Sequence, residues 1–280
     1  MSTGEITLLG ALAGVTIFLG LPVGRVRALP PMLRALLNAG AAGVLVFLLV
    51  ETVHNGFDPV QTAVRDGAWG DVVLRSALFV AAFGLGLLGL VYYERRLSRR
   101  RVVPPPGPGA ARLDAVAAPV GSPADPRSAT RRLVVFIAAG IGLHNLAEGL
   151  AIGQSAAANK VSLAVLLVIG FGLHNATEGF GIVAPLAAEA DRPSWGFLGW
   201  LGLLGGGPTF VGTLIGQSVT STELEVAFLA LAAGSILYVI VQLLSVAFRL
   251  EHDPRHVMWG LFVGLALGLF TDLVLVAAGV

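Results

Sequence analysis

Residues 140–149 read GIGLHNLAEG and residues 170–179 read GFGLHNATEG, so one pattern occurs twice at an offset of 30 residues. The motif residues are His144, Asn145 and Glu148 in the first copy, and His174, Asn175 and Glu178 in the second. Positions four apart lie on the same face of a helix, so each copy presents an imidazole and a carboxylate to one side. Both copies lie in apolar runs, where ionisable side chains are costly and are usually paired or bound to an ion.

Two histidines and two glutamates at this spacing form a suitable ligand set for a divalent transition metal. Imidazole suits zinc, iron, copper or nickel, and the carboxylates supply negative charge. The alternative is that each His-Glu pair only makes hydrogen bonds between helices and holds a bundle together. Because the whole pattern is duplicated, we favour the metal site.

The composition is that of a membrane protein. Hydrophobic residues make up 55% of the 280 and charged residues 12%, with a mean hydropathy of +0.83. These values exclude an ordinary soluble domain and predict a polytopic membrane protein. The chain has no cysteine, which excludes disulfides, thiolate ligands and cysteine nucleophiles. The first five residues lack the basic character of a signal peptide, so we expect the first apolar run to be a retained span.

A transmembrane helix needs about 20 predominantly apolar residues, and eight segments of the chain qualify. The sequence therefore predicts an all-α bundle of eight transmembrane helices that forms a single domain over residues 1–280. The predicted spans are Ile6 to Val26, Met32 to Val53, Val72 to Tyr93, Leu133 to Ala156, Val161 to Leu186, Trp195 to Gly216, Val226 to Phe248, and Val257 to Val280.

Arginine and lysine set the expected orientation. With both termini outside, 15 of the 18 basic residues lie on the cytoplasmic side, and only Arg65, Arg75 and Lys160 lie outside. The positive-inside rule favours this arrangement. Residues 95–132 are rich in arginine, proline, glycine and alanine, which predicts a disordered basic cytoplasmic loop between spans three and four. We expect its arginines to set topology and contact anionic lipid rather than bind nucleic acid.

The two motifs fall about halfway along spans four and five, which run antiparallel. We therefore expect one shared site near the middle of the bilayer, where alternating-access carriers place their substrate. Glu51 and His54, followed by Asp58, mark the outer end of span two. They form either a collecting or gating site for cations or a polar cluster at a helix end. Gln242 in span seven either lines a path or bonds across helices.

His-Asn-x-x-Glu-Gly in the fourth and again in the fifth of eight spans, after a long cytoplasmic loop, resembles the ZIP family of divalent-metal transporters, in particular its bacterial GufA-like and ZupT-like branch. The resemblance implies a first metal site made by His144, Glu148, His174 and Glu178. It also implies an adjoining second site that uses Asn145, Asn175 and a glutamate before a proline in span six. Here Gly207 precedes Pro208, and a further family glutamate in span seven is replaced by Gln242. We therefore expect one bound metal rather than a bridged pair.

The sequence thus predicts a carrier that moves a divalent transition metal inward across a bacterial plasma membrane. Zinc is the expected substrate, with iron and manganese as alternatives, and no other cofactor is expected. The expected partners are the metal ion and the lipid bilayer, with no nucleic acid, and a homodimer is a candidate assembly. The alternative is a relative that binds metal as a structural or sensing site without transporting it, since family carboxylates are missing. An enzyme is not expected: His-Glu-x-x-His is absent, and five histidines are too few for a membrane di-iron oxygenase.

Overall fold

A computed structural model describes residues 2–26, 30–99, 126–157, 161–188, 191–218 and 221–277. Within these ranges the regular elements are helices and no strand occurs, which confirms the all-α class. The α-helices are α1 Thr3–Val15, α2 Ile17–Gly20, α3 Pro31–Arg65, α4 Trp69–Arg99, α5 Pro126–Ala157, α6 Val161–Val183, α7 Trp195–Gly216, α8 Thr222–Leu250 and α9 Pro254–Ala277. The 3-10 helices are η1 Leu21–Arg25 and η3 Ala184–Ala188.

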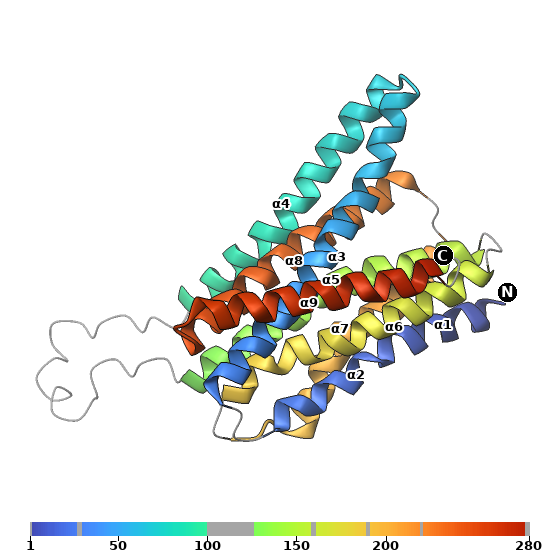
Figure 1. Ribbon diagram of the computed structural model, residues 1–280. Helices are drawn as coiled ribbons and strands as arrows, with labels where there is room; N and C mark the ends of the chain where they lie inside the picture. The colour runs from blue at the N-terminus through green and yellow to red at the C-terminus, as the bar shows by residue number, and fades with distance from the viewer. Residues whose placement is uncertain are drawn as a thin grey trace, which may run out of the picture.

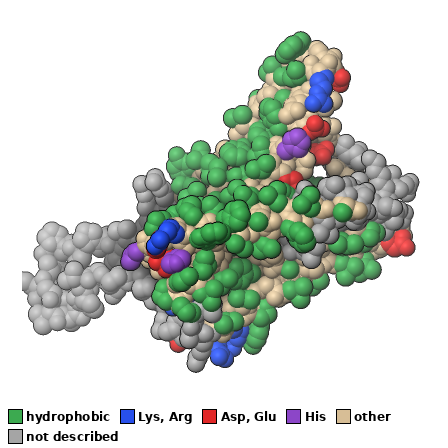
Figure 2. All heavy atoms as spheres, viewed as in Figure 1, with side chains coloured by type: hydrophobic (Ala, Val, Ile, Leu, Met, Phe, Trp, Pro, Cys, Tyr) green, Lys and Arg blue, Asp and Glu red, His purple; other side chains and the backbone are tan. Residues whose placement is uncertain are grey.

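Six helical segments in the described part of the chain are long and apolar enough to cross a membrane. They are Thr3–Arg25, Pro31–Arg65, Trp69–Tyr92, Thr130–Ala157, Trp195–Gly216 and Thr222–Leu250, and a shorter apolar helix covers Pro254–Phe270. The chain is therefore a multi-pass membrane protein. Figure 2 shows hydrophobic side chains over most of the visible face, with charged groups toward its ends. Eight spans and the position of the termini stay predictions.

Two predicted segments differ in detail from the observed helices. The first span is interrupted at Thr16, between α1 and α2, where the Thr16 hydroxyl donates to the Ala13 carbonyl at 2.6 Å. Such a side-chain bond competes with the backbone ladder and disturbs it. The predicted loop 95–132 is helical at both described ends, because α4 continues to Arg99 and α5 begins at Pro126. Positions 100–125 lie outside the described residues.

Serine side chains start several of these helices. Ser2 and Glu5 form a reciprocal capping box at α1, in which the Ser2 N–H donates to the Glu5 carboxylate at 2.7 Å. Ser194 accepts from the Phe197 N–H at the start of α7, and Ser221 accepts from the Leu224 N–H at the start of α8. Each bond satisfies a backbone donor that has no partner within the helix.

The helices form two groups that share one buried core (Figure 1). In one group, α5 packs against α7 and α6, while α1 packs against α7 and α6. In the other group, α3 packs against α8 and α9, while α4 packs against α8. Small residues at the contacts let the backbones approach closely, which is how helices associate in lipid.

Glycine contacts in the first group reveal an approximate two-fold relation. A Cβ at Gly149 of α5 would overlap the Thr209 carbonyl of α7, and a Cβ at Gly179 of α6 would overlap the Ile17 carbonyl of α2. Gly14 and Gly206 meet reciprocally, because a Cβ on either would overlap the carbonyl oxygen of the other. These contacts relate α5 to α6 and the α1–α2 segment to α7.

The second group follows the same relation. A Cβ at Gly43 of α3 would overlap the Leu261 carbonyl of α9, and a Cβ at Gly234 of α8 would overlap the Phe83 carbonyl of α4. Helix α3 therefore corresponds to α8, and α9 corresponds to α4. The duplicated sequence motif is the recognisable part of a repeat that extends through the bundle.

The relation is imperfect at the α3–α4 hairpin. Helix α3 continues to Arg65 and turns at Gly67, whose φ of 70° is in the left-handed region that favours glycine. This hairpin projects beyond the remaining helices (Figure 1).

Candidate metal site

The two motifs lie in the interiors of α5 and α6, two consecutive helices that contact each other. His144 Nε2 lies 3.2 Å from Glu148 Oε1 on its own helix and 3.9 Å from Glu178 Oε1 on α6. The three side chains are nearly inaccessible, with exposed fractions of 6% for His144, 4% for Glu148 and 1% for Glu178. The structure thus brings together three of the four residues of the predicted first site.

Apart from the contact of His144 with the two glutamates, these buried groups have no hydrogen-bond partner among the side chains and backbone that the structure describes. Within the described residues, both carboxylate oxygens of Glu148, both of Glu178 and both ring nitrogens of His144 make no hydrogen bond. Most buried polar atoms are hydrogen-bonded, and a buried ionised carboxylate without compensation is strongly unfavourable. A divalent cation would supply that compensation, and the oxygen and imidazole donors fit a transition metal.

The motif asparagines connect the site to the flanking helices in the same way in both halves. The Asn145 amide donates to the Gly205 carbonyl of α7 at 3.0 Å, and the Asn175 amide donates to the Ala13 carbonyl of α1 at 2.9 Å. Both asparagines are fully buried, and in the described part of the chain the Oδ1 atom of each has no hydrogen-bond partner. The hydrogen bond from the amide nitrogen therefore fixes the side chain. The Oδ1 atom beside each motif is then an oxygen that could ligate a metal ion.

The remaining predicted residues have different outcomes. His174 lies in α6, but its side chain is outside the described residues. Glu51 of α3 is partly buried. His54 is exposed and Gln242 is partly buried. Within the described side chains, no three acidic or histidine residues have the full geometry of a metal site.

Gly207, where the resemblance implied a lost carboxylate, faces away from the motifs. A Cβ at Gly207 would have no atom within 4 Å, whereas neighbouring Gly205 and Gly206 are packed against other helices. One helical turn on either side, Leu203 and Val211 are exposed on the same face. A side chain at this position would therefore project from the exposed face of α7.

Sequence reasoning missed two features of the site. Thr209 of α7 is fully buried, and its hydroxyl has no hydrogen-bond partner among the residues described by the structure. A hydroxyl directly after Pro208 in an otherwise apolar helix was the only signal for it. The Ala13 and Gly205 carbonyls that hold the asparagines gave no signal, because backbone acceptors occur at every position.

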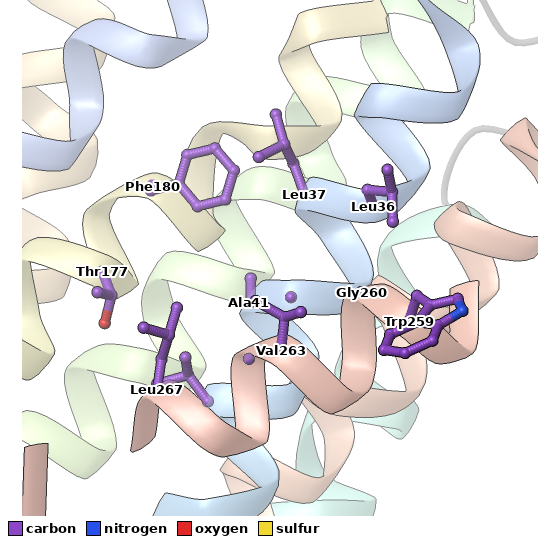
Figure 3. A pocket seen from close by; sticks show the side chains of 12 residues that line it. Leu36, Leu37, Ala41, Thr177, Phe180, Trp259, Gly260, Val263 and Leu267 are labelled. Atoms are coloured by element: carbon purple, nitrogen blue, oxygen red, sulfur yellow. The ribbon is translucent and has the colours of Figure 1, made fainter. Parts of the chain in front are cut away.

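A separate apolar groove of about 370 Å³ lies between α3, α6 and α9 (Figure 3). Leu37 and Ala41 line it from α3, Phe180 from α6, and Val263 and Leu267 from α9. It contains no ionisable side chain and is not a metal site. On the related side of the bundle α5 packs against α8, and the Ser235 hydroxyl of α8 donates to the Gly140 carbonyl at 3.0 Å.

Comparison with known proteins gives the family. A model of the ZIP zinc transporter family matches residues 120–272, more than half of the chain, and the match includes both motifs. No curated protein matches the chain. Transport of divalent metal cations is thus supported in general, and the metal ion is the substrate. With two buried motif copies inside the matched region, the chain belongs to the ZIP family.

Proposed function

We propose that this protein transports zinc through a site formed by His144, Glu148, His174 and Glu178, with Asn145 and Asn175 as adjoining oxygen donors. The observation that carries the proposal is the buried group of His144, Glu148 and Glu178, in which no side-chain nitrogen or oxygen has a hydrogen-bond partner among the residues that the structure describes. Two carboxylates neutralise a divalent cation, and neutral imidazoles ligate it without adding charge. Iron and manganese are alternative substrates, because selectivity depends on geometry as well as on ligand type.

The asymmetry between the two related halves supports alternating access. Helix α5 is bonded to α8 through Ser235, whereas a groove separates parts of α3 and α6 on the related side. In the exchanged state, α6 would pack closely against α3, and a groove would open between α5 and α8. This exchange would move the site relative to α3 and α8 and would keep the repeat. Carriers with repeated halves use this kind of exchange to offer a central site to each side in turn.

Finer assignments belong to the same proposal. We place the protein in the plasma membrane of a bacterium with both termini outside, moving metal inward, and in the GufA-like and ZupT-like branch. The loss of family carboxylates at Gly207 and Gln242 motivates a non-transporting alternative and the expectation of one metal per chain. A homodimer remains the proposed assembly.

The test is zinc flux into proteoliposomes. We expect Glu148→Gln and Glu178→Gln each to reduce flux at least tenfold, because each removes a buried negative charge while keeping the side-chain shape. Glu251→Gln is the matched control, since Glu251 pairs with His256 at 3.4 Å outside the site. Undiminished flux in both site variants would reject the site, and tight zinc binding without flux in the wild type would select the non-transporting alternative.

A further inference from the structure

The wall that α9 contributes to the apolar groove has an ordered row of side chains. Arg255, Trp259, Val263 and Leu267 follow one another at steps of four residues, so they lie in one row along the helix. All four are exposed, and the exposed fractions of Trp259, Val263 and Leu267 are 62%, 50% and 53%. Figure 3 shows these three side chains in sequence along α9, where it borders the groove. The row therefore passes from a cation through an aromatic ring to aliphatic side chains.

The opposite walls of the groove are also apolar. Leu37 and Ala41 line it from α3, and Phe180 lines it from α6. Among the described residues that line the groove, only Thr177 and Trp259 have a polar atom in the side chain. A second hollow, of about 440 Å³, lies beside the first turns of α9 and shares Trp259 with the groove. A hydrocarbon chain in the groove contacts three helices, so it makes more dispersion contacts there than on a flat helix surface.

The length of the row matches the depth of one leaflet of a bilayer. From Arg255 to Leu267 the helix advances twelve residues, which is about 18 Å at 1.5 Å per residue. Half of the hydrocarbon core of a bilayer measures about 15 Å. Arg255 is in the first turn of the apolar helix Pro254–Phe270, where the polar headgroups begin, and Trp259 follows one turn later, where tryptophan is enriched in membrane proteins.

Asp253 holds the Arg255 side chain in place at this level. Arg255 Nε and Nη2 donate to the Asp253 carboxylate at 3.0 Å and 2.7 Å. Within the described residues, the hydrogen bonds of this guanidinium use Nε and Nη2 only, and the side chain is 83% exposed. A guanidinium presents several N–H donors in one plane and suits phosphate oxygens. The N–H groups of Nη1 are therefore available to a phosphate at the mouth of the groove.

We propose that the groove binds one phospholipid per chain, with an acyl chain along Trp259, Val263 and Leu267 and its phosphate at Arg255. The order of the row selects this occupant, because a phospholipid has the same order of groups over the same length. An apolar helix of another protein would match the groove but not the exposed cation at its mouth. A soluble anion would match the cation but not the groove.

The related side of the bundle lacks this pattern. Leu261 of α9 corresponds to Phe83 of α4, because the carbonyls of both meet a glycine of the neighbouring helix. Arg255 therefore corresponds to Ala77, and the other three positions of the row correspond to Ala81, Leu85 and Gly89. Neither a cation nor an aromatic ring occurs in that row, so the proposed lipid site exists on one side only.

Quenching of tryptophan fluorescence by a phospholipid with brominated acyl chains tests the site in the purified full chain in detergent. One chain keeps only Trp259, and a matched chain keeps only Trp200, with the other three tryptophans of each changed to Phe. Trp200 is a fair control because it is also the sixth residue of its helix and is 48% exposed. We expect half-quenching of Trp259 at a ratio of brominated lipid to detergent about tenfold lower than for Trp200.

Two glycines test the acyl-chain part of the site in the chain that keeps Trp259. Gly40 lines the groove, and among the described atoms a Cβ there would meet only the Gly260 carbonyl oxygen, at 3.7 Å. Gly40→Leu should therefore fill the groove and raise the ratio for half-quenching to that of Trp200. Gly84→Leu on α4 is the matched control, because a Cβ at Gly84 would meet no described atom within 4 Å. It should leave the quenching of Trp259 unchanged.

Two arginines test the phosphate part. Arg255→Gln removes the charged donors and should raise the ratio for half-quenching of Trp259 about fivefold, in line with the loss of one charge-assisted hydrogen bond. Arg249→Gln removes an exposed charge from the adjoining end of α8 and should leave the ratio unchanged.

Each contrary result overturns the lipid site. These results are equal quenching of Trp259 and Trp200, unchanged quenching of Trp259 in Gly40→Leu, and an equal loss in either control variant. Light scattering on the same samples tests the rival occupant: a dimer in the wild type that becomes a monomer in Gly40→Leu would assign the groove to a second copy of the chain. If Gly40→Leu does not fold, the comparison of the two tryptophans and the effect of Arg255→Gln decide. All these measurements are made without zinc, so their outcome is separate from that of the proposed transport.

Discussion

Adjacent glycines in α7 provide a matched test of how closely the helices pack. A Cβ at Gly206 would overlap the Gly14 carbonyl of α1 and approach Ile17 Cγ2 at 2.9 Å, whereas a Cβ at Gly207 would meet nothing within 4 Å. Gly206→Ala therefore adds one methyl group to a filled contact between backbones, and Gly207→Ala adds it to open space.

The two substitutions share the same gain in helix propensity, about 0.5–1 kcal/mol per Gly→Ala change, so it cancels in their comparison. The remaining difference is the cost of overpacking, typically about 1–3 kcal/mol. We expect the upper part of that range, because the obstructing atom is a backbone oxygen that cannot rotate aside. Gly207→Ala should be at least as stable as the wild type, and Gly206→Ala about 2–3 kcal/mol less stable than Gly207→Ala.

Unfolding by SDS in mixed micelles, followed by tryptophan fluorescence, measures this difference. Trp195 and Trp200 lie on α7 itself and report on that helix. Zinc affinity provides a second measurement, because Gly206 follows the Gly205 carbonyl that holds Asn145. Equal free energies of unfolding for the two variants would refute the close α1–α7 contact and the two-fold relation based on it.

Two further predictions address the ends of the bundle. Because the chain has no cysteine, Asp66→Cys in the α3–α4 hairpin and His252→Cys in the α8–α9 turn each create a single thiol. A membrane-impermeant maleimide applied to intact cells should label only Asp66→Cys, and the opposite pattern would contradict the proposed orientation. In the same turn, the Arg255 guanidinium bonds Asp253 and lowers the pKa of that carboxyl to about 2. Arg255→Ala should return this pKa toward about 3.9, whereas Arg249→Ala should not, as NMR titration of the carboxyl carbon can measure. Since the folded-state pKa is the lower one, the stabilisation by this pair is present above pH of about 4 and is lost as the pH falls through about 2, where variant and wild type should converge.

Much of the fold could be predicted because lipid imposes simple constraints on sequence. Apolar runs of membrane length mark helices, since an unsatisfied backbone group in hydrocarbon costs several kcal/mol. The break at Thr16 was missed because it depends on a single hydroxyl that bonds a carbonyl three residues earlier. The start of α5 at Pro126 was missed because the apolar pattern begins only after Arg131 and Arg132, whereas the helix already begins five residues before Arg131.

For the site, the sequence predicted His144, Glu148 and Glu178, because ionisable side chains are rare in such runs and the motif occurs twice, and the structure places these three side chains together. It made no prediction of the direction in which Gly207 faces, since the face of a helix that meets its neighbours depends on packing and not on spacing to a proline. It also left Glu51 undecided, because a residue at a helix end has the same pattern whether or not it approaches another helix.

The sequence by itself determined that the chain is a helical membrane protein with two copies of an acidic and imidazole motif, because hydropathy and helical spacing are local properties. Only the tertiary structure decided that His144 meets Glu178 across two helices and that Gly205 and Ala13 hold the asparagines. These relations depend on which backbones approach closely, and that is fixed by glycine contacts between segments far apart in the chain.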